Sequence, residues 1–288
     1  MLKVGIVSLE STHVDAYCKL LNSDAGLDGM RVEGARVTAL CRHEDPPQRV
    51  QELRQAYGIE QVCETPTEML PHVDVAMILA RDGDLHRGQA LPFLNAGTPT
   101  FVDKPFAHSM GDAHTMVQRA RDNGAPLMSC SSLRYAVELA GMQSEIRQLG
   151  PISHCHCSGP GELFFYGVHL VEMAHTLLGP GIQSVTNTAD EHRDIMTLRW
   201  TDAGTASLSL LRNAEVGFHC SVFCDKGERH TGVADVAYYR HQLGHFVEMC
   251  RTGIEPIPLE HTLEIMRVLT AAQVSRNRDG ATVPLAEV

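Results

Sequence analysis

The feature that most constrains this chain is a regular alternation of short apolar runs and amphipathic helical runs over residues 1–130. Three of the helical runs stop at Gly58, Gly97 and Gly124, where a glycine can take the left-handed conformation that ends a helix. Strands joined by single helices pair in parallel, because each crossover returns the chain to the same edge of the sheet. The pattern predicts a doubly wound parallel sheet of Rossmann type, an α/β fold.

The expected elements of this first domain follow from the periodicity of apolar residues. The expected strands are Leu2–Val7, Ala35–Cys41, Gln61–Cys63, Val73–Leu79, Pro99–Val102 and Pro126–Cys130. The expected helices are His13–Leu21, Asp45–Tyr57, a single turn from Thr65, Leu85–Asn95 and Ser109–Asn123.

From residue 131 to residue 288 the pattern changes. Strand-like runs now follow one another through short turns, which is typical of an antiparallel sheet. The expected strands are Ile152–Cys157, Ile182–Thr188, Asp194–Trp200, Thr205–Arg212 and Val216–Phe223, and the expected helices are Tyr135–Gln148, Leu163–Leu178, Tyr238–Arg251 and Leu259–Arg276. We expect a C-terminal α+β domain over 131–288 with a mainly antiparallel sheet, and no further strand in the short run Asp225–His230 before the last two helices.

Composition excludes several classes of protein. The 288 residues are 43% hydrophobic and carry a formal charge of −11 without a basic block, so we expect neither a nucleic acid nor an anionic membrane as partner. No apolar run approaches the roughly 20 residues that cross a bilayer. The nine scattered cysteines suit buried thiols in a reducing compartment. We expect a cytoplasmic protein.

The run Thr98–Phe106 carries the first candidate site. Its strand ends at Asp103, Lys104 and Pro105, because proline cannot continue strand pairing. In open parallel sheets, ligands bind at the carboxyl ends of the strands. A surface lysine in a turn is the alternative interpretation.

The turn after the first strand carries the second candidate site. A strand that enters a helix through a tight turn can bind phosphate when glycines allow a close approach, but here Gly5 is the only glycine and Glu10 adds a negative charge. Arg42 follows the second strand, and an arginine at this position suits a 2′-phosphate, which favours NADP slightly over NAD. A plain structural turn and a solvated arginine remain alternatives.

The third candidate site lies in the second half. His169 and Glu172 are three residues apart and share one face of a predicted helix. A histidine moves protons near neutral pH, and a lysine does so when burial or a nearby cation lowers its pKa.

The Asp103-Lys104-Pro105 turn and the run Gly167–Glu172, each in its own type of domain, resemble the glucose–fructose oxidoreductase / inositol dehydrogenase / MocA (Gfo/Idh/MocA) family. The resemblance covers essentially the whole chain. It implies an oxidoreductase that moves a hydride between NAD or NADP and a sugar, cyclitol or related polyhydroxylated small molecule, and a homodimer or homotetramer. It also implies that Lys104 hydrogen-bonds the reacting oxygen, that His169 is the catalytic histidine, and that the two meet across a cleft beside the nicotinamide.

The resemblance assigns three sets of residues. The catalytic residues are Lys104, His169 and Asp103. The residues assigned to cofactor binding are Gly5, Ser8, Ser11, Thr12, His13, Arg42, Ala80, Arg81, His86, Asp103 and Lys104. The residues assigned to substrate binding are Lys104, Arg134, Tyr166, His169 and Glu172.

Two features motivate a different class of function. Glu10 lies in the turn that faces a pyrophosphate, and Phe165 stands where many family members have a carboxylate, although Glu162 or Glu172 could replace it. The alternatives are a non-redox binding or assembly subunit, or a lyase-type enzyme that uses NAD(P) transiently.

Other constellations are weaker. In the run His154–Cys157 the histidines face one side of a strand and the cysteines the other, so all four cannot close on one metal ion. Cys220 and Cys224 could contribute ligands only if their segment folds close by, and we expect no metal. Cys130 is expected to be a buried thiol, and His241 with His245 a solvated or interface face. Tyr135, like Tyr166, serves substrate contact or packing.

Overall fold

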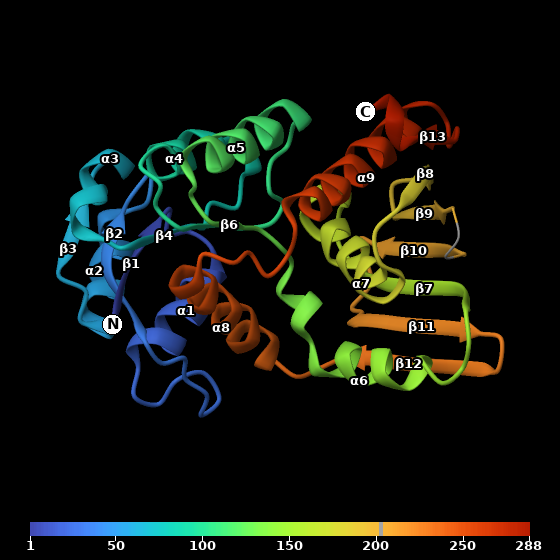
Figure 1. Ribbon diagram of the computed structural model, residues 1–288, viewed down its shortest axis with the longest axis horizontal. Helices are drawn as coiled ribbons and strands as arrows, with labels where there is room; N and C mark the ends of the chain where they lie inside the picture. Colours follow the sequence, from blue (N-terminus) through green and yellow to red (C-terminus); the bar gives the residue numbers. More distant parts are fainter. Residues whose placement is uncertain (202–203) are drawn as a thin grey trace. The chain divides into compact units, whose positions relative to one another are not determined.

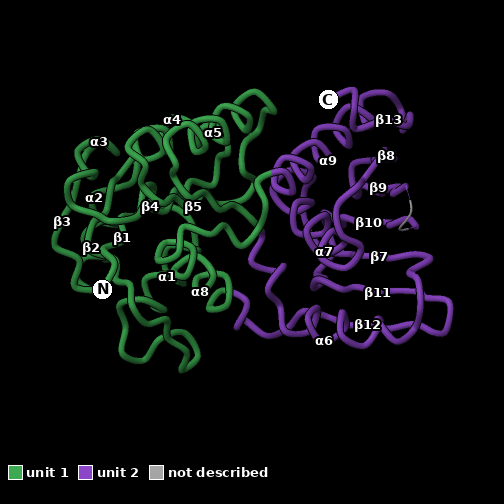
Figure 2. Tube along the Cα trace, viewed as in Figure 1, with its two compact units in different colours: residues 1–130, 239–259 green, residues 131–238, 260–288 purple. Residues whose placement is uncertain are grey.

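The computed structural model describes residues 1–201 and 204–288, which divide into two compact units (Figures 1 and 2). Unit 1 comprises Met1–Cys130 and Tyr239–Leu259, and unit 2 comprises Ser131–Tyr238 and Glu260–Val288. Within residues 1–201 and 204–288, no helix is both long enough and apolar enough to cross a membrane.

Unit 1 is built on a six-stranded sheet with the order β3-β2-β1-β4-β5-β6, in which all neighbours run parallel. Its strands are β1 Leu2–Val7, β2 Ala35–Cys41, β3 Gln61–Cys63, β4 Val75–Ile78, β5 Thr100–Val102 and β6 Leu127–Met128. Its helices are α1 Thr12–Asn22, α2 Pro47–Tyr57, α3 Pro66–Met69, α4 Gly83–Asn95 and α5 Met110–Asn123, with a 3₁₀ turn at Leu70–His72. The sheet has α4 and α5 on one side and α1 on the other (Figure 1). The predicted doubly wound parallel sheet is confirmed.

Local chemistry sets the ends of these helices. The side chain of Ser11 caps α1 by accepting the backbone N–H of His13. Gly58 and Gly124 end α2 and α5 in the left-handed conformation.

Helix α8 (Ala237–Thr252) follows the strands of unit 2 in the sequence, but all of it from Tyr239 onward belongs to unit 1. The hydroxyl of Tyr17 donates to Gln242 Oε1 at 2.6 Å, and Gln242 Nε2 donates to the carbonyl of Cys130 at 3.0 Å. Gln242 is 2% exposed, so these bonds satisfy a buried amide and attach α8 to α1. Because these partners are far apart in sequence, the division at residue 130 did not assign Tyr239–Leu259 to the first domain.

The register of the sheet aligns the residues that follow the strands. Cys41, Val7, Ile78 and Val102 form one row across β2, β1, β4 and β5. The loops that follow this row therefore leave the sheet at a single edge. The strand order reverses between β1 and β4, and ligands bind at such a switch point in doubly wound folds.

Unit 2 contains a seven-stranded sheet with the order β12-β11-β7-β10-β9-β8-β13. Its strands are β7 Ile152–Pro160, β8 Ile182–Ala189, β9 Arg193–Trp200, β10 Thr205–Leu211, β11 Phe218–Cys224, β12 Gly227–Val233 and β13 Val283–Pro284. Its helices are α6 Val137–Ile146, α7 Val168–Leu178 and α9 Leu259–Asn277, with 3₁₀ turns at Ser132–Tyr135 and Leu285–Glu287 and a π-helical turn at Leu163–Gly167. Only β7 and β10 pair in parallel among these strands, which confirms the mainly antiparallel sheet.

Strand β12 corrects one prediction. No strand was predicted in the short run Asp225–His230, but Gly227–Val233 forms a strand that pairs with β11 along its whole length. The strand carries Glu228, Arg229 and His230, and its residues alternate between exposed and half-buried. Charged residues are typical of edge strands, where they discourage pairing with other chains, and they hid the apolar signal of a strand.

Candidate active site

The loop after β5 forms the centre of the candidate site in unit 1. Asp103 is 3% exposed, and its Oδ1 accepts the backbone N–H of Lys104 at 2.8 Å. Its Oδ2 lies 2.6 Å from Nδ1 of His13, the second residue of α1. The Lys104–Pro105 peptide bond is cis. The sequence placed Lys104 at a strand end, and the structure adds a buried carboxylate beside it.

The electrostatics of this loop favour a lysine that can exchange a proton. Burial lowers the pKa of Lys104, and the guanidinium of Arg81 lowers it further, while Asp103 opposes both effects. Burial raises the pKa of Asp103, but His13 and Lys104 outweigh that effect, so the pKa of Asp103 lies below its usual value. A lysine only 5% exposed, with a lowered pKa, is a group suited to general acid–base chemistry.

His86 holds the neighbouring loop in place. Its Nδ1 lies 3.1 Å from the carbonyl oxygen of Phe106, and its Nε2 lies 2.9 Å from that of Ala80. His86 is fully buried. Both ring nitrogens therefore contact backbone carbonyls, and His86 joins the loop after β4 to the loop after β5, which carries Lys104.

Gly5, the one glycine predicted for the turn after β1, does not lie in that turn. Gly5 lies within β1, and a Cβ there would be 2.3 Å from Sδ of Met69, so Gly5 allows close packing of α3. The turn itself begins at Ser8, which is 1% exposed and has a φ of 63°. Gln89 Nε2 donates to Ser8 Oγ at 2.8 Å. A serine therefore holds the left-handed position for which glycine is better suited.

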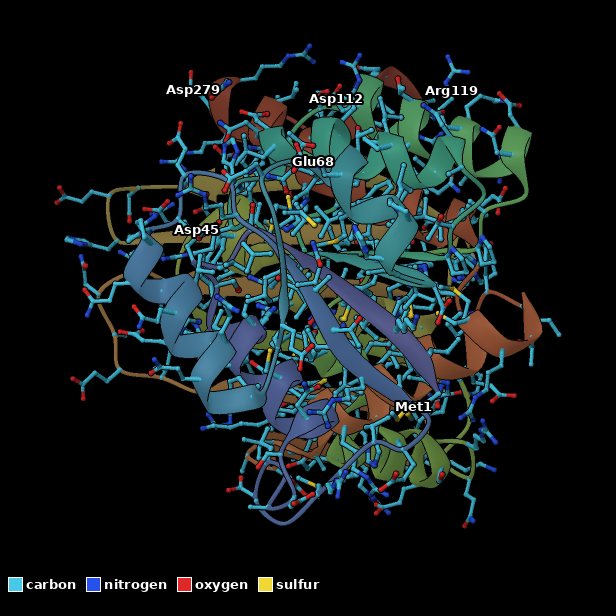
Figure 3. The ribbon with its side chains drawn as sticks, turned by 90° about the vertical axis from the view of Figure 1, so that its left-hand side faces the viewer. Met1, Asp45, Glu68, Asp112, Arg119 and Asp279 are labelled. Carbon is cyan, nitrogen blue, oxygen red and sulfur yellow. The ribbon has the colours of Figure 1, made fainter. Side chains whose placement is uncertain are left out.

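Glu10 lies beside the switch point. Its Oε1 accepts the backbone N–H of Arg81 at 2.8 Å, which links the turn after β1 to the loop after β4. Asp45, labelled in Figure 3 before α2, supports the same turn because its Oδ1 accepts the N–H of Leu9 at 3.0 Å. The Glu10 side chain brings a negative charge to the crevice where doubly wound folds hold phosphates.

Two further residues predicted to bind the cofactor, Thr12 and Arg42, lie at the start of α1 and directly after β2. Thr12 is exposed at the start of α1. Arg42, directly after β2, donates from Nε to Glu64 Oε2 at 2.8 Å, with a side chain 36% exposed. The Arg42 guanidinium therefore already has an acidic partner.

His169 forms the centre of the candidate site in unit 2. It lies in the first turn of α7, is 8% exposed, and its Nδ1 lies 2.6 Å from Ser131 Oγ. Ser131 is fully buried, and its Oγ also accepts the N–H of Leu133 at 3.1 Å. Ser131 therefore fixes the orientation of the imidazole. Tyr166 packs near it, with ring centroids 6.0 Å apart.

Ser131 is a residue that the sequence analysis missed. The run of serines around Cys130 was considered only for the thiol. Its position shortly after the last parallel strand, β6, was the available signal, because the loops that follow parallel strands border ligand sites.

Arg134 and Glu172 contact each other. Arg134 Nε donates to Glu172 Oε2 at 2.5 Å, and Glu172 Oε1 accepts the N–H of Ser131 at 3.2 Å. Glu172 is 2% exposed, and burial raises its pKa despite the opposing charge of Arg134. Arg134 also lies 3.2 Å from Nδ1 of His175, and burial together with this guanidinium lowers the pKa of His175 to about 3. Both oxygens of Glu172 are thus engaged within unit 2.

Two weaker constellations have ordinary structural surroundings. Cys130 is 2% exposed, and its Sγ lies 3.5 Å from Gln242 Nε2, as expected for a buried thiol. Burial, with a smaller contribution from His241, lowers the pKa of His245.

Comparison with known proteins shows a similar fold and a family match within unit 1. Residues 9–130 match Gfo/Idh/MocA, described as an oxidoreductase family with an NAD-binding Rossmann fold. Inositol 2-dehydrogenase 2 of Paenarthrobacter aurescens is 26% identical over 193 residues, which cover 56% of this chain and 58% of the relative. The match thus spans little more than half the length of that curated protein.

Two solved structures share the whole fold. A probable dehydrogenase from Thermotoga maritima has a TM-score of 0.87 at 16% identity and covers 100% of both chains. The scyllo-inositol dehydrogenase of Lactobacillus casei with bound NAD(H) and scyllo-inositol has a TM-score of 0.85 at 16% identity and covers 99% of both chains.

Proposed function

We propose, from the match of residues 9–130 to the Gfo/Idh/MocA family, that this chain is an NAD(P)-dependent oxidoreductase acting on a small polyhydroxylated molecule. The substrate class is a sugar, a cyclitol or a related polyol, as in the names of the similar dehydrogenases. The observation that carries the proposal is the buried Lys104 with a lowered pKa, in the loop that follows the inner parallel strand β5.

The residues of unit 1 fit a nicotinamide dinucleotide, with one residue opposed to it. The fit comes from the switch point between β1 and β4, from the N-terminal end of α1, and from the two cations Lys104 and Arg81. Glu10 is the opposing residue because its carboxylate repels phosphate. Since Glu10 is exposed, its side chain is free to turn towards water when a phosphate binds.

The chemistry divides between cofactor and protein. When bound, the nicotinamide supplies the acceptor or donor of a hydride. In the oxidation direction, we assign to Lys104 the acceptance of the hydroxyl proton, and in the reduction direction its return to the oxygen. Asp103 and His13 are positioning residues, because their hydrogen bond fixes the backbone that carries Lys104.

In unit 2, we assign to His169 the second proton-handling role. The contact of Ser131 Oγ with Nδ1 orients the imidazole for this role. Arg134 and Glu172 are proposed to support this site by fixing the backbone of Ser131. Tyr166 is the proposed substrate contact beside the imidazole.

The finer assignments rest on single residues and on the family. Arg42 favours NADP if its guanidinium exchanges Glu64 for a 2′-phosphate. Homodimer or homotetramer formation, a cytoplasmic location, and the division into a dinucleotide-binding and a substrate domain stay predictions.

Nucleotide binding is the first test. The purified chain is titrated with NADH and NADPH by fluorescence, and then assayed with a panel of inositols and sugars by nucleotide absorbance. We expect saturable binding of at least one nucleotide, and turnover that Lys104→Ala and His169→Ala strongly reduce. A wild-type chain that binds neither nucleotide overturns the proposal.

Glu10 favours a second candidate function. The Glu10 carboxylate accepts the N–H of Arg81 at the switch point, where a bound dinucleotide would place its phosphates. Such a contact is expected of a family member that has become a non-redox binding or assembly subunit. A lyase-type enzyme that uses NAD(P) transiently is the related possibility. Product analysis separates the latter from a dehydrogenase, because substrate is then consumed without net change in nucleotide absorbance.

A further inference from the structure

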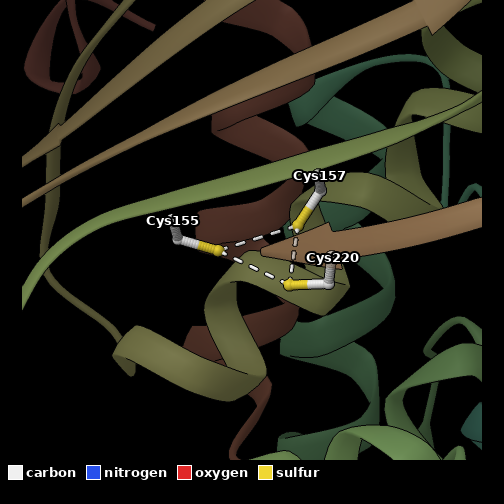
Figure 4. Close-up of side chains that lie close together, drawn as sticks. All are labelled: Cys155, Cys157 and Cys220. Atoms are coloured by element: carbon white, nitrogen blue, oxygen red, sulfur yellow. Dashed lines mark hydrogen bonds between the residues drawn. The ribbon is translucent and has the colours of Figure 1, made fainter. Parts of the chain in front are cut away.

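Three cysteines from two strands converge in the interior of unit 2. Cys155 and Cys157 lie two residues apart on β7 and point to the same side, and Cys220 on β11 pairs directly with Cys157. Their side chains point towards one another in Figure 4. The Sγ–Sγ distances are 3.8 Å for Cys155–Cys157, 3.7 Å for Cys155–Cys220 and 3.6 Å for Cys157–Cys220.

These distances form a nearly equilateral triangle of sulfurs. In a tetrahedral site with metal–sulfur bonds of about 2.3 Å, neighbouring sulfurs lie about 3.8 Å apart. The triangle therefore has the size of one face of such a tetrahedron. A disulfide, by contrast, needs two sulfurs about 2.05 Å apart, and each cysteine is a free thiol.

The surroundings of the triangle suit a soft metal ion. Cys155 and Cys157 have no exposed surface, and Cys220 is 1% exposed. Their neighbours in the sheet are apolar, because Cys155 pairs with Ala206 and Cys157 with Leu208. His154 and His156 bond instead to Ser207 on the other face of the sheet. The available ligands are therefore three thiols.

The thiols also contact one another directly. The Sγ of Cys157 donates a hydrogen bond to the Sγ of Cys220 at 3.6 Å. An ion bound by all three sulfurs would replace these weak thiol–thiol contacts with metal–thiolate bonds.

We propose that Cys155, Cys157 and Cys220 form a three-thiolate site for one thiophilic metal ion of the class of Zn²⁺ and Cu⁺. Three protein ligands complete a trigonal site for Cu⁺ and leave one position for an exogenous ligand on Zn²⁺. Binding replaces the thiol protons, which are released to solvent. The site lies within unit 2 and does not depend on the proposed dehydrogenase activity.

Metal titration tests this site. The reduced, chelator-treated chain is titrated with Zn²⁺, and separately with Cu⁺ under a reductant, each against a chromophoric competitor. We expect one equivalent of at least one ion to bind with proton release. We expect Cys157→Ser and Cys220→Ser to weaken binding at least about tenfold, which corresponds to about 1.4 kcal/mol. The matched controls Cys224→Ser and Cys250→Ser alter partly exposed thiols and should bind as the wild type does.

A wild-type measurement covers the case in which a serine variant fails to fold. The bound ion should slow alkylation of Cys155, Cys157 and Cys220 in the native chain, as read by mass spectrometry, and leave Cys224 unchanged. The proposal is overturned if neither ion binds at one equivalent, if the control variants lose binding, or if the ion does not slow alkylation of these three thiols. A Cys157–Cys220 disulfide in freshly purified chain also overturns it.

Discussion

Nδ1 of His13 lies 2.6 Å from Oδ2 of Asp103, a hydrogen bond between residues 90 positions apart. It connects the first turn of α1 to the loop after β5, with β4 between β1 and β5 in the sheet order. Both side chains are nearly buried, so neither can exchange this partner for water at low cost. The backbone position of Lys104, in the loop after β5, therefore depends on a hydrogen bond from α1. Helix α1 follows β1, which lies on the other side of the switch point.

Replacing His13 should destabilise the chain. His13→Ala leaves the buried Asp103 carboxylate without this partner, which costs about 1–3 kcal/mol in the free energy of unfolding at neutral pH. The pKa of Asp103 is lowered on folding, so its stabilisation is present above its unfolded pKa near 3.8 and is lost as pH falls through the folded value. Urea unfolding of wild type and variant should thus converge below that pH. A constant difference across pH would contradict this account.

Lys104→Ala should lower kcat about 10²–10⁴-fold, because the variant lacks the group that exchanges the hydroxyl proton. Lys104→Arg should not restore activity, since arginine keeps its proton. The lowered pKa of Lys104 predicts that kcat/KM for oxidation rises with pH around a value below 10.5, and that this limb disappears in the variants. Steady-state kinetics and nucleotide titration measure both effects. Lys19→Ala, an exposed lysine on α1, is the control, and equal loss of activity there would count against the assignment.

Glu10→Gln should tighten nucleotide binding. The amide keeps an oxygen that accepts the N–H of Arg81 but removes the charge that faces the phosphates. We expect the Kd for NADH and NADPH to fall about three- to tenfold at low salt, and less at high salt, because exposed charges are screened. Glu52→Gln removes an equally exposed charge from α2 and should leave the Kd unchanged. An unaltered Kd in Glu10→Gln would show that the carboxylate does not meet the phosphates.

Arg42→Ala should raise the Kd for NADPH about tenfold and leave that for NADH unchanged, because charge-assisted hydrogen bonds to a 2′-phosphate contribute about 1.5–3 kcal/mol. Glu64→Gln removes the acid that competes for the same guanidinium and should lower the Kd for NADPH. Parallel fluorescence titrations of both nucleotides measure the ratio. If both variants change the two Kd values equally, Arg42 does not select the cofactor.

Arg134→Leu should cost about 3–5 kcal/mol, because it leaves the buried Glu172 without its ion-pair partner. Burial raises the pKa of Glu172 above the unfolded value of 4.5, and the loss of Arg134 should raise it further. The contribution of Glu172 is favourable below the unfolded pKa and is lost as pH rises through the folded value. The variant should therefore lose more stability at pH 8 than at pH 5. The double variant with Glu172→Gln should remove this pH dependence, as measured by denaturant unfolding.

The sequence was sufficient for features that depend on neighbours along the chain. The predicted strands Leu2–Val7, Ala35–Cys41 and Gln61–Cys63 have the observed bounds, because apolar periodicity and glycine stops are local signals. The place of Lys104 at a strand end follows from Pro105 in the same way. Strand β12 was missed because its charged edge residues carry no apolar alternation.

Contacts between distant residues were decided only by the tertiary structure. The bonds of His13 with Asp103 and of Ser131 with His169 join residues 90 and 38 positions apart, and no local pattern encodes them. Cys220 is the clearest example of what the sequence alone could not predict. The alternation of residues in β7 showed that Cys155 and Cys157 share a face, but it did not show which strand lies beside them. The pairing of β11 with β7 supplies the third sulfur, since strand register depends on packing over the whole sheet.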